Sequence, residues 1–173
     1  MKFGIIKERK NPPDRRVVFT PEELIRLQSE HPEAEIKVES SDIRIFSDDH
    51  YRNLGLNVTT DMTDCDVLFG VKEVPIDALI PNKKYFFFSH TIKKQPYNRK
   101  LLQAILAKNI ELYDHETIVD ATNHRLIGFG RYAGLVGAYN GFRGFGIKYD
   151  LFTLPKAEKL SGKEDLIARL KRQ

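Results

Sequence analysis

Two segments of the chain end an apolar run on residues that could transfer protons. Val67 to Val71 is followed by Lys72 and Glu73, and Tyr85 to Phe88 leads through a serine to His90. Short runs rich in valine and phenylalanine are typical of buried parallel strands. If these strands are neighbours, all three polar side chains meet at the carboxyl edge of the sheet, where ligands bind in open α/β folds. A lysine, a glutamate and a histidine at that edge could form an acid–base site.

Each of these residues also has a plainer interpretation. A lysine–glutamate pair after a strand is usually an exposed ion pair, and a histidine at a strand end is more often structural than catalytic. The shared position of Lys72 and His90 favours the functional interpretation for both.

Signals for strands and helices alternate along the chain. Strands are expected at residues 2–7, 35–39, 67–71, 85–88, 110–113 and 125–129. Helices are expected after an N-cap at Thr20, after Asp48 or Asp49, and over residues 96–108. This alternation predicts an α/β fold of Rossmann-like or flavodoxin-like type, with a mostly parallel sheet and helices on both faces in three layers.

Residues 130–147 carry glycines at alternating spacings of four and three, namely Gly130, Gly134, Gly137, Gly141 and Gly144. Such spacing describes one face of a helix, although each glycine costs up to about 1 kcal/mol relative to alanine there. Close approach of another backbone would compensate for this cost. Large apolar residues occupy the other faces, so we expect a buried helix that joins two domains.

Composition limits the class of protein. The 173 residues suffice for one core, and 41% hydrophobic with 30% charged residues is typical of a soluble globular chain. No signal peptide and no run of roughly 18 apolar residues is present, so we expect no membrane partner. The single cysteine, Cys65, excludes an internal disulfide and favours the cytoplasm. The net charge of +4 comes with no nucleic-acid motif, and the histidines lack metal-ligand spacing, so we expect neither partner.

The C-terminal residues predict that the protein continues. Ser161 to Glu164 has the pattern of a capping box that opens a last helix, and the chain stops at Gln173 within that helix's charged end. We therefore expect a substrate-side domain over residues 1–129, an inter-domain helix over 130–149, and the start of a connection to a further domain over 150–173.

One glycine motif imitates a dinucleotide site. Gly128 to Ala133 satisfies G-x-G-x-x-A, with Asp150 about twenty residues further on. A dinucleotide site requires a complete strand–helix–strand unit, and no convincing second strand follows. Helix packing explains the same glycines, so we assign no cofactor-binding residue in this chain.

Several motifs together resemble one family. Gly4 to Glu8, Arg16 to Pro21 and Gly70 to Pro75 resemble the N-terminal domain of alanine dehydrogenase and transhydrogenase. Phe87 to Lys93 is similar to the narrower branch of lysine-ketoglutarate reductases and lysine-forming saccharopine dehydrogenases. Leu112 to Glu116 and Phe129 to Gly134 fit that branch too.

The resemblance implies a function and roles for individual residues. It implies an oxidoreductase domain that makes or cleaves saccharopine from lysine and 2-oxoglutarate, with NAD or NADP bound mainly by a C-terminal Rossmann domain absent from this chain. It implies that the chain alone is inactive. It also implies that Lys72 and His90 form the acid–base pair, that Arg16 and Arg125 bind substrate carboxylates, and that Glu73 and Glu116 set the protonation of the pair. The residues before Arg125, Asn123 and His124, depart from the family pattern.

Two alternatives remain open. The chain could belong to an alanine dehydrogenase-like amino-acid dehydrogenase, although Ser89 to Lys93 argues against this. It could also be a stand-alone module that binds an amino acid or a partner without catalysis. The sequence does not decide between NAD and NADP, the direction of reaction or the oligomeric state.

Overall fold

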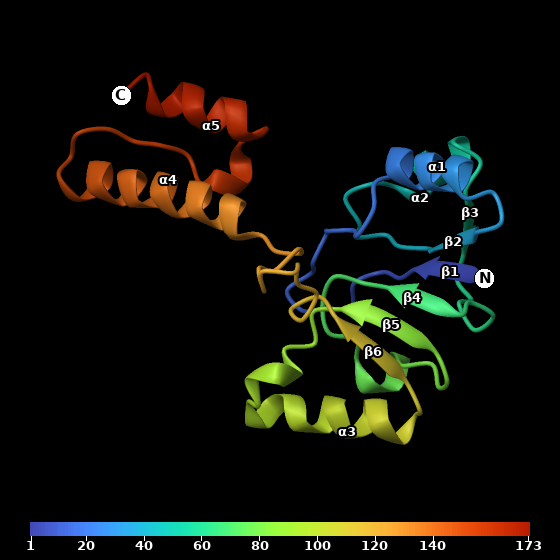
Figure 1. Ribbon diagram of the computed structural model, residues 1–173. Helices are drawn as coiled ribbons and strands as arrows, with labels where there is room; N and C mark the ends of the chain where they lie inside the picture. The colour runs from blue at the N-terminus through green and yellow to red at the C-terminus, as the bar shows by residue number, and fades with distance from the viewer. The chain divides into compact units, whose positions relative to one another are not determined.

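A computed structural model describes all residues from Met1 to Gln173. The chain divides into two compact units, Met1–Ile127 and Gly128–Gln173 (Figure 1). None of its helices combines the length and the apolar character needed to cross a membrane.

The first unit is built on a six-stranded sheet with the order β3-β2-β1-β4-β5-β6, in which every pair is parallel. The strands are β1 (Lys2–Ile5), β2 (Glu35–Glu39), β3 (Asn57–Thr59), β4 (Val67–Phe69), β5 (Lys84–Phe87) and β6 (Glu111–Asp114). This order reverses direction between β1 and β4, which is the switch point of a doubly wound α/β sheet. The predicted α/β class and mostly parallel sheet are confirmed.

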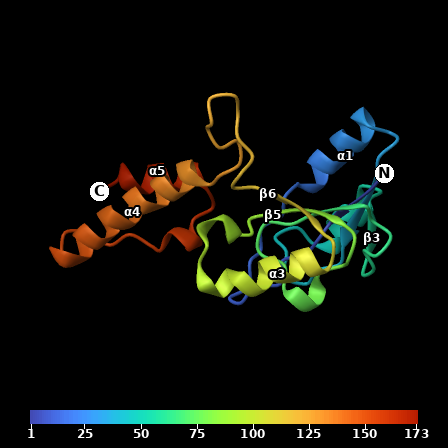
Figure 2. The same ribbon diagram turned by 60° about the horizontal axis from the view of Figure 1, so that its bottom comes forward.

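Helices cover both faces of this sheet (Figures 1 and 2). They are α1 (Pro21–Glu30), α2 (Asp48–Asn53) and α3 (Arg99–Ala107). One apolar cluster joins Leu24 of α1 and Tyr51 of α2 to the sheet, and a second joins Leu101 and Ile105 of α3 to it. Neighbouring residues of a strand point to opposite faces, so the apolar strands supply both clusters at once.

Two helix starts show how local sequence sets the boundaries. The Thr20 side chain accepts from the Glu23 backbone N–H, and the Glu23 carboxylate accepts from the Thr20 N–H, which completes the capping box predicted there. In α2 the cap is Ser47 rather than the expected Asp48 or Asp49, because the Ser47 hydroxyl accepts from the His50 N–H.

One predicted strand is wrong, and one strand of the sheet was not predicted. Residues 125–129 are not a strand of the sheet, because the only bridge there pairs Val119 with Arg125 in an isolated antiparallel contact. The third strand of the sheet, β3, had no signal in the sequence because Asn57–Thr59 is too short to show alternation.

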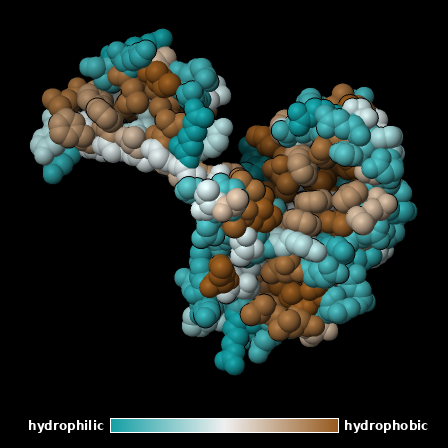
Figure 3. All heavy atoms as spheres, viewed as in Figure 1, coloured by the Kyte–Doolittle hydropathy of each residue, from teal (hydrophilic) through white to brown (hydrophobic).

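The second unit contains α4 (Gly130–Lys148) and α5 (Lys163–Leu170). The helix predicted over 130–147 is confirmed, but it is not buried. Tyr139 and Gly146 are its only buried residues, whereas Tyr132 is 65% exposed. Figure 3 shows brown apolar side chains open on the surface of this unit. Tyr139 packs against Leu154 and Leu166.

The glycine face of α4 is bare in the described chain. A Cβ atom added at Gly130, Gly134, Gly137, Gly141 or Gly144 would meet no atom within 4 Å. Gly137 and Gly141 lie two residues from Tyr139, about 200° around the helix, so they face away from the packed side. The second unit by itself therefore does not supply the expected close backbone approach.

The capping box expected at the start of the last helix does not form. The N-cap of α5 is Gly162, which makes no side-chain cap, and the Ser161 N–H instead donates to Asp165 Oδ2 at 3.2 Å. Asp165, the residue directly after Glu164, thus accepts the backbone hydrogen bond that the sequence pattern assigned to Glu164.

Candidate acid–base site at the carboxyl edge of the sheet

The polar residues predicted to meet do so at the carboxyl edge. Lys72 and Glu73 follow β4, His90 follows β5 and Glu116 follows β6, and these three strands are consecutive neighbours. His90 Nε2 lies 3.7 Å from Glu73 Oε1, and His90 Nδ1 lies 3.1 Å from Glu116 Oε2. The predicted convergence of Glu73 and His90 is confirmed, and Glu116 joins them, whereas Lys72 lies at the same edge without a contact to any of the three.

The backbone at His90 adopts an unusual conformation. Its φ of 57° and ψ of 9° lie in the left-handed region, which a residue with a Cβ atom rarely adopts. The buried Asn98 side chain donates from Nδ2 to the His90 carbonyl at 3.0 Å and helps to hold this conformation. Strained backbone held by its surroundings is frequent at functional sites, so His90 has the structural character of a positioned residue.

Lys93 joins the same cluster, because the short 3₁₀ helix Thr91–Lys93 begins directly after His90. Its Nζ lies 2.9 Å from His90 Nδ1 and 3.1 Å from Glu116 Oε1. A neutral ring nitrogen either donates or accepts, so Nδ1 can donate to Glu116 or accept from Lys93 but not both. His90 therefore finds a partner at Nδ1 in both of its protonation states, as an acid–base group requires.

The Glu116 carboxylate is held in its ionised form. Burial opposes its ionisation most strongly, but hydrogen bonds from Lys93 and His90 outweigh this and keep its pKa below the ordinary value of 4.5. Arg125 adds a further positive charge, with Nη1 3.8 Å from Glu116 Oε1. The structure thus brings Arg125 to the site even though its flanking sequence departs from the family pattern.

Lys72 differs from His90 in having no side-chain partner. Its side chain is half-buried and makes no hydrogen bond or ion pair within the chain. Its charge still reaches Asp14, whose pKa is lowered first by hydrogen bonding to Arg16 and in smaller part by Lys72. The Lys72 ammonium group is therefore available to a ligand.

Arg16 lies on the Lys72 side of the edge. Its Nε donates to Asp14 Oδ1 at 2.9 Å, so Asp14 fixes the direction of the guanidinium group. The nearby Glu8 carboxyl is buried, and this burial raises its pKa, although hydrogen bonds from two backbone N–H groups oppose the shift. All six predicted site residues lie in the first unit, and Glu116 is the carboxylate that directly joins His90 to Arg125.

Three further residues make contacts at the carboxyl edge although the sequence patterns predicted no role for them. Lys10 Nζ lies 3.4 Å from Glu73 Oε2, and Lys93 bridges His90 and Glu116. Lys93 lies one 3₁₀ turn after His90, and Glu8 follows β1 at the same edge, so spacing and strand order could have indicated both. Lys10 has no such signal, because it reaches Glu73 from a loop.

A buried network supports the loops that carry the site. Ser89 donates to the Asp114 carboxylate, and the Thr91 N–H donates to Ser89 Oγ at 3.1 Å. The Asp114 carboxylate also accepts from the Glu116 N–H at 2.8 Å. These bonds tie the residues after β5 to those after β6 and fix the spacing of His90 and Glu116.

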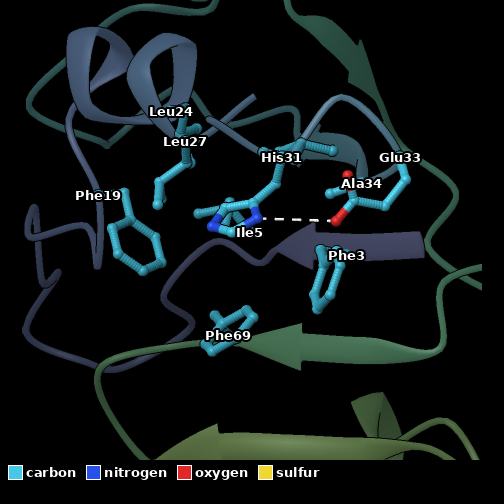
Figure 4. Close-up of a pocket in the computed structure, with 10 residues that line it drawn as sticks. Phe3, Ile5, Phe19, Leu24, Leu27, His31, Glu33, Ala34 and Phe69 are labelled. Carbon is cyan, nitrogen blue, oxygen red and sulfur yellow. Dashed lines mark ion pairs between the residues drawn. The ribbon is translucent and has the colours of Figure 1, made fainter. Parts of the chain in front are cut away.

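An apolar pocket of about 360 Å³ lies elsewhere, between α1 and the sheet (Figure 4). Phe3, Phe19 and Phe69 line it, and its only charged pair is His31 with Glu33, at 3.6 Å. None of the acid–base residues lines this pocket. It can hold apolar groups, and the residues of the carboxyl edge take no part in it.

The dinucleotide-like motif does not have the surroundings that a dinucleotide needs. No strand of the sheet leads into Gly128, and Gly130 is already the first residue of α4. No strand follows α4 either. A dinucleotide phosphate is normally held where a strand turns into a helix, so these residues do not fit the cofactor.

Comparison with known proteins gives a family match, relatives of similar sequence and a solved structure of similar fold. The family model for the alanine dehydrogenase/PNT N-terminal domain matches residues 4–136. The chain is 35% identical to an alpha-aminoadipic semialdehyde synthase of Arabidopsis thaliana over 147 residues, which covers 83% of this chain and 14% of that protein. It is 29% identical to a saccharopine dehydrogenase (NAD(+), L-lysine-forming) of Yarrowia lipolytica over 133 residues, which covers 74% of this chain and 35% of that protein.

A solved structure of L-alanine dehydrogenase has the same fold, with a TM-score of 0.66 at 18% identity, over 87% of this chain and 42% of that one. The chain thus spans less than half the length of these relatives. With the parallel sheet and the charged carboxyl edge in place, the family match over residues 4–136 shows that this chain belongs to the alanine dehydrogenase/PNT N-terminal domain family, with relatives among saccharopine-metabolising oxidoreductases.

Proposed function

We propose that this chain is the substrate-binding and acid–base part of an oxidoreductase that forms or cleaves saccharopine, the secondary amine that links lysine to 2-oxoglutarate. The contacts of His90 with Glu73 and Glu116, at the sheet edge where Lys72 also lies, carry this proposal. The similarity to an alpha-aminoadipic semialdehyde synthase and to saccharopine dehydrogenases supports the choice of substrate.

The reaction needs two proton transfers that this edge can supply. A secondary amine must lose its proton before it is oxidised to an imine, and hydrolysis of the imine requires an activated water molecule. His90 can hold or release a proton at Nδ1, because Glu116 and Lys93 are both in contact with that atom. Lys72 has no competing partner and can exchange a proton with the ligand. We assign these two residues as the acid–base pair.

The charged residues around the pair suit a substrate with several carboxylates. An arginine can bind a carboxylate with two parallel hydrogen bonds, and Arg16 and Arg125 lie on the two sides of the edge. Glu73 and Glu116 face His90 and balance the positive charge there. We propose that Arg16 and Arg125 bind and orient the substrate, while the glutamates set the protonation of the pair.

The hydride step belongs to a group that this chain does not hold. NAD or NADP, when bound, supplies the hydride exchange with the substrate carbon. We propose that a C-terminal Rossmann-type domain outside this chain binds that cofactor. The residues of this chain then bind the substrate, orient it and move its protons.

Calorimetric titration of the 1–173 chain tests the substrate class. Saccharopine and 2-oxoglutarate should bind weakly, and Arg125→Met or Arg16→Met should weaken the binding by about tenfold. Arg26→Met, which removes an exposed guanidinium on α1, serves as the control. Equal binding of pyruvate and saccharopine, unaffected by either arginine variant, would contradict the proposal.

A further inference from the structure

Three backbone groups at the end of β4 form hydrogen bonds with two buried side chains, and these side chains follow other strands of the sheet. The Gly70 carbonyl accepts from His115 Nε2 at 3.1 Å. The Val71 N–H donates to Glu8 Oε1 at 2.7 Å, and the Lys72 N–H donates to Glu8 Oε2 at 2.8 Å. Glu8 follows β1 and His115 follows β6, so the segment that carries Lys72 is held from both sides of β4.

The Gly70 carbonyl and the Val71 N–H belong to a single planar peptide group. Its oxygen is bound to His115 and its N–H to Glu8, so the peptide cannot rotate without breaking both hydrogen bonds. The Val71 carbonyl accepts from the Phe88 N–H at 3.1 Å, which adds a third attachment on β5. A Cβ atom at Gly70 would lie 3.0 Å from Ile6 Cδ1, so the backbone is also closely packed.

The protonation of His115 follows from its partner. A carbonyl oxygen only accepts, so Nε2 must carry the ring proton and Nδ1 must be without one. Nδ1 is buried with no hydrogen-bond partner, and the ring packs edge-on against Phe88 at 5.0 Å between centroids. A leucine would fill similar space without an unpaired nitrogen. What histidine adds at this position is therefore the hydrogen bond to Gly70.

We propose that Glu8 and His115 are positioning residues that fix the Gly70–Glu73 backbone so that Lys72 and Glu73 are directed at the acid–base site. Backbone placement matters most for Lys72, because its side chain has no partner to direct it. This inference rests on the acid–base role proposed above for Lys72. We call the hydrogen bonds of Glu8 and His115 to the Gly70–Lys72 backbone the clamp. The clamp, in contrast, can be measured without any catalysis.

Amide hydrogen exchange in the 1–173 chain tests the clamp. His115→Leu removes the donor, and His115→Gln returns an N–H near the Nε2 position. We expect exchange at the Val71 and Lys72 amides to be about tenfold faster in the leucine variant and close to the parent rate in the glutamine variant. The amide of Ile36, in β2, should be unchanged in both.

Glu8→Gln provides a second route if His115→Leu does not fold. It keeps one acceptor oxygen but places an NH₂ group opposite one of the two backbone N–H groups, so exchange at Val71 or Lys72 should again be faster. Parent-like exchange at both amides in every folded variant would overturn the clamp.

Kinetics of the longer enzyme, which means this chain together with the proposed cofactor-binding domain, separates a positioning role of His115 from simple packing. His115→Leu should lower kcat by about tenfold with little change in KM, and His115→Gln should restore kcat to within about threefold of the parent. Parent-like kcat in the leucine variant would overturn the positioning role even with faster exchange. If Lys72→Met leaves turnover unchanged, the proposed function and the positioning role both fail, while the exchange result still shows the clamp.

Discussion

His90 and Lys72 lie at the same sheet edge, but the protein holds them by different means. His90 is surrounded by side chains: two carboxylates and an ammonium group contact its ring nitrogens, and Asn98 binds its carbonyl. Lys72 makes no side-chain hydrogen bond or ion pair, and only its backbone N–H is bound, by Glu8.

This difference separates two tasks of an acid–base pair. Direct contacts with charged groups fix where the His90 ring points. Backbone contacts alone leave the Lys72 amine without a competing partner and, in the proposal above, fix the direction of its Cα–Cβ bond. Changes to neighbouring side chains should therefore act strongly on His90, whereas Lys72 should respond to changes in the backbone that carries it.

The largest expected effect comes from removing either member of the pair in the longer enzyme. Lys72→Met and His90→Asn should each lower turnover by about 10²–10⁴-fold, the usual contribution of a positioned acid or base. The double variant should be less than additive, because the two groups serve one reaction. Steady-state kinetics of the four proteins tests this. Fully additive losses would show that the two residues do not act as a unit.

The next effect should be specific to His90. Glu116→Gln removes the carboxylate charge that contacts His90 Nδ1, so kcat of the proposed longer enzyme should fall by about tenfold. Steady-state kinetics measures this, with Glu111→Gln on the exposed side of β6 as the control. Parent-like kcat in Glu116→Gln would mean that this carboxylate does not support the action of His90.

A smaller effect should follow from the backbone support of His90. Asn98→Ala removes one of the two hydrogen bonds to the His90 carbonyl, which keeps its bond from the Lys93 N–H, so the loss in the free energy of unfolding should be about 0.5–1.5 kcal/mol. Chemical denaturation measures the loss. Asn140→Ala, at an exposed position on α4, should change stability by no more than about 0.5 kcal/mol. Equal effects of the two changes would remove Asn98 from this role.

The smallest effect concerns His115, on the Lys72 side of the comparison. Burial lowers its pKa below the ordinary value of 6.5, although the hydrogen bond to Gly70 opposes the shift. Because the unfolded chain takes up this proton first, the free energy of unfolding should fall as pH falls from about 6.5 toward the lowered pKa. Glu8 acts in the opposite sense, because burial raises its pKa above 4.5.

His115→Gln removes the His115 contribution and leaves that of Glu8. Denaturation at about pH 7.5 and about pH 5.5 should therefore show a smaller loss of stability on acidification in this variant than in the parent. His124→Gln, at an exposed histidine, is the matched control. An identical pH dependence in the parent and His115→Gln would contradict the burial effect.

Sequence patterns predicted the parts of the site that lie next to strong strand signals. The apolar runs before Lys72 and His90 placed both residues at the carboxyl edge, since parallel strands end there together. The contact of His115 with Gly70 spans 45 positions, and no local pattern encodes which ring nitrogen meets which carbonyl. Strand order could have placed Glu8 at this edge, but not its hydrogen bond to Val71, 63 positions away.

The glycine helix shows the opposite outcome. The spacing from Gly130 to Gly144 correctly predicted a helix, but no backbone of the second unit itself lies against the glycines, and the expected contact with another domain stays a prediction. A periodic pattern reports the face of a helix, and only tertiary contacts decide what covers that face.

The pH dependence of turnover in the longer enzyme tests the central claim most directly. In the parent, kcat/KM should depend on two ionisations, one from each member of the acid–base pair. Lys72→Met should remove one of them and His90→Asn the other, with both variants folded. If each variant keeps the full pH profile of the parent, Lys72 and His90 are not the acid–base pair, and the proposed function of this sheet edge is wrong.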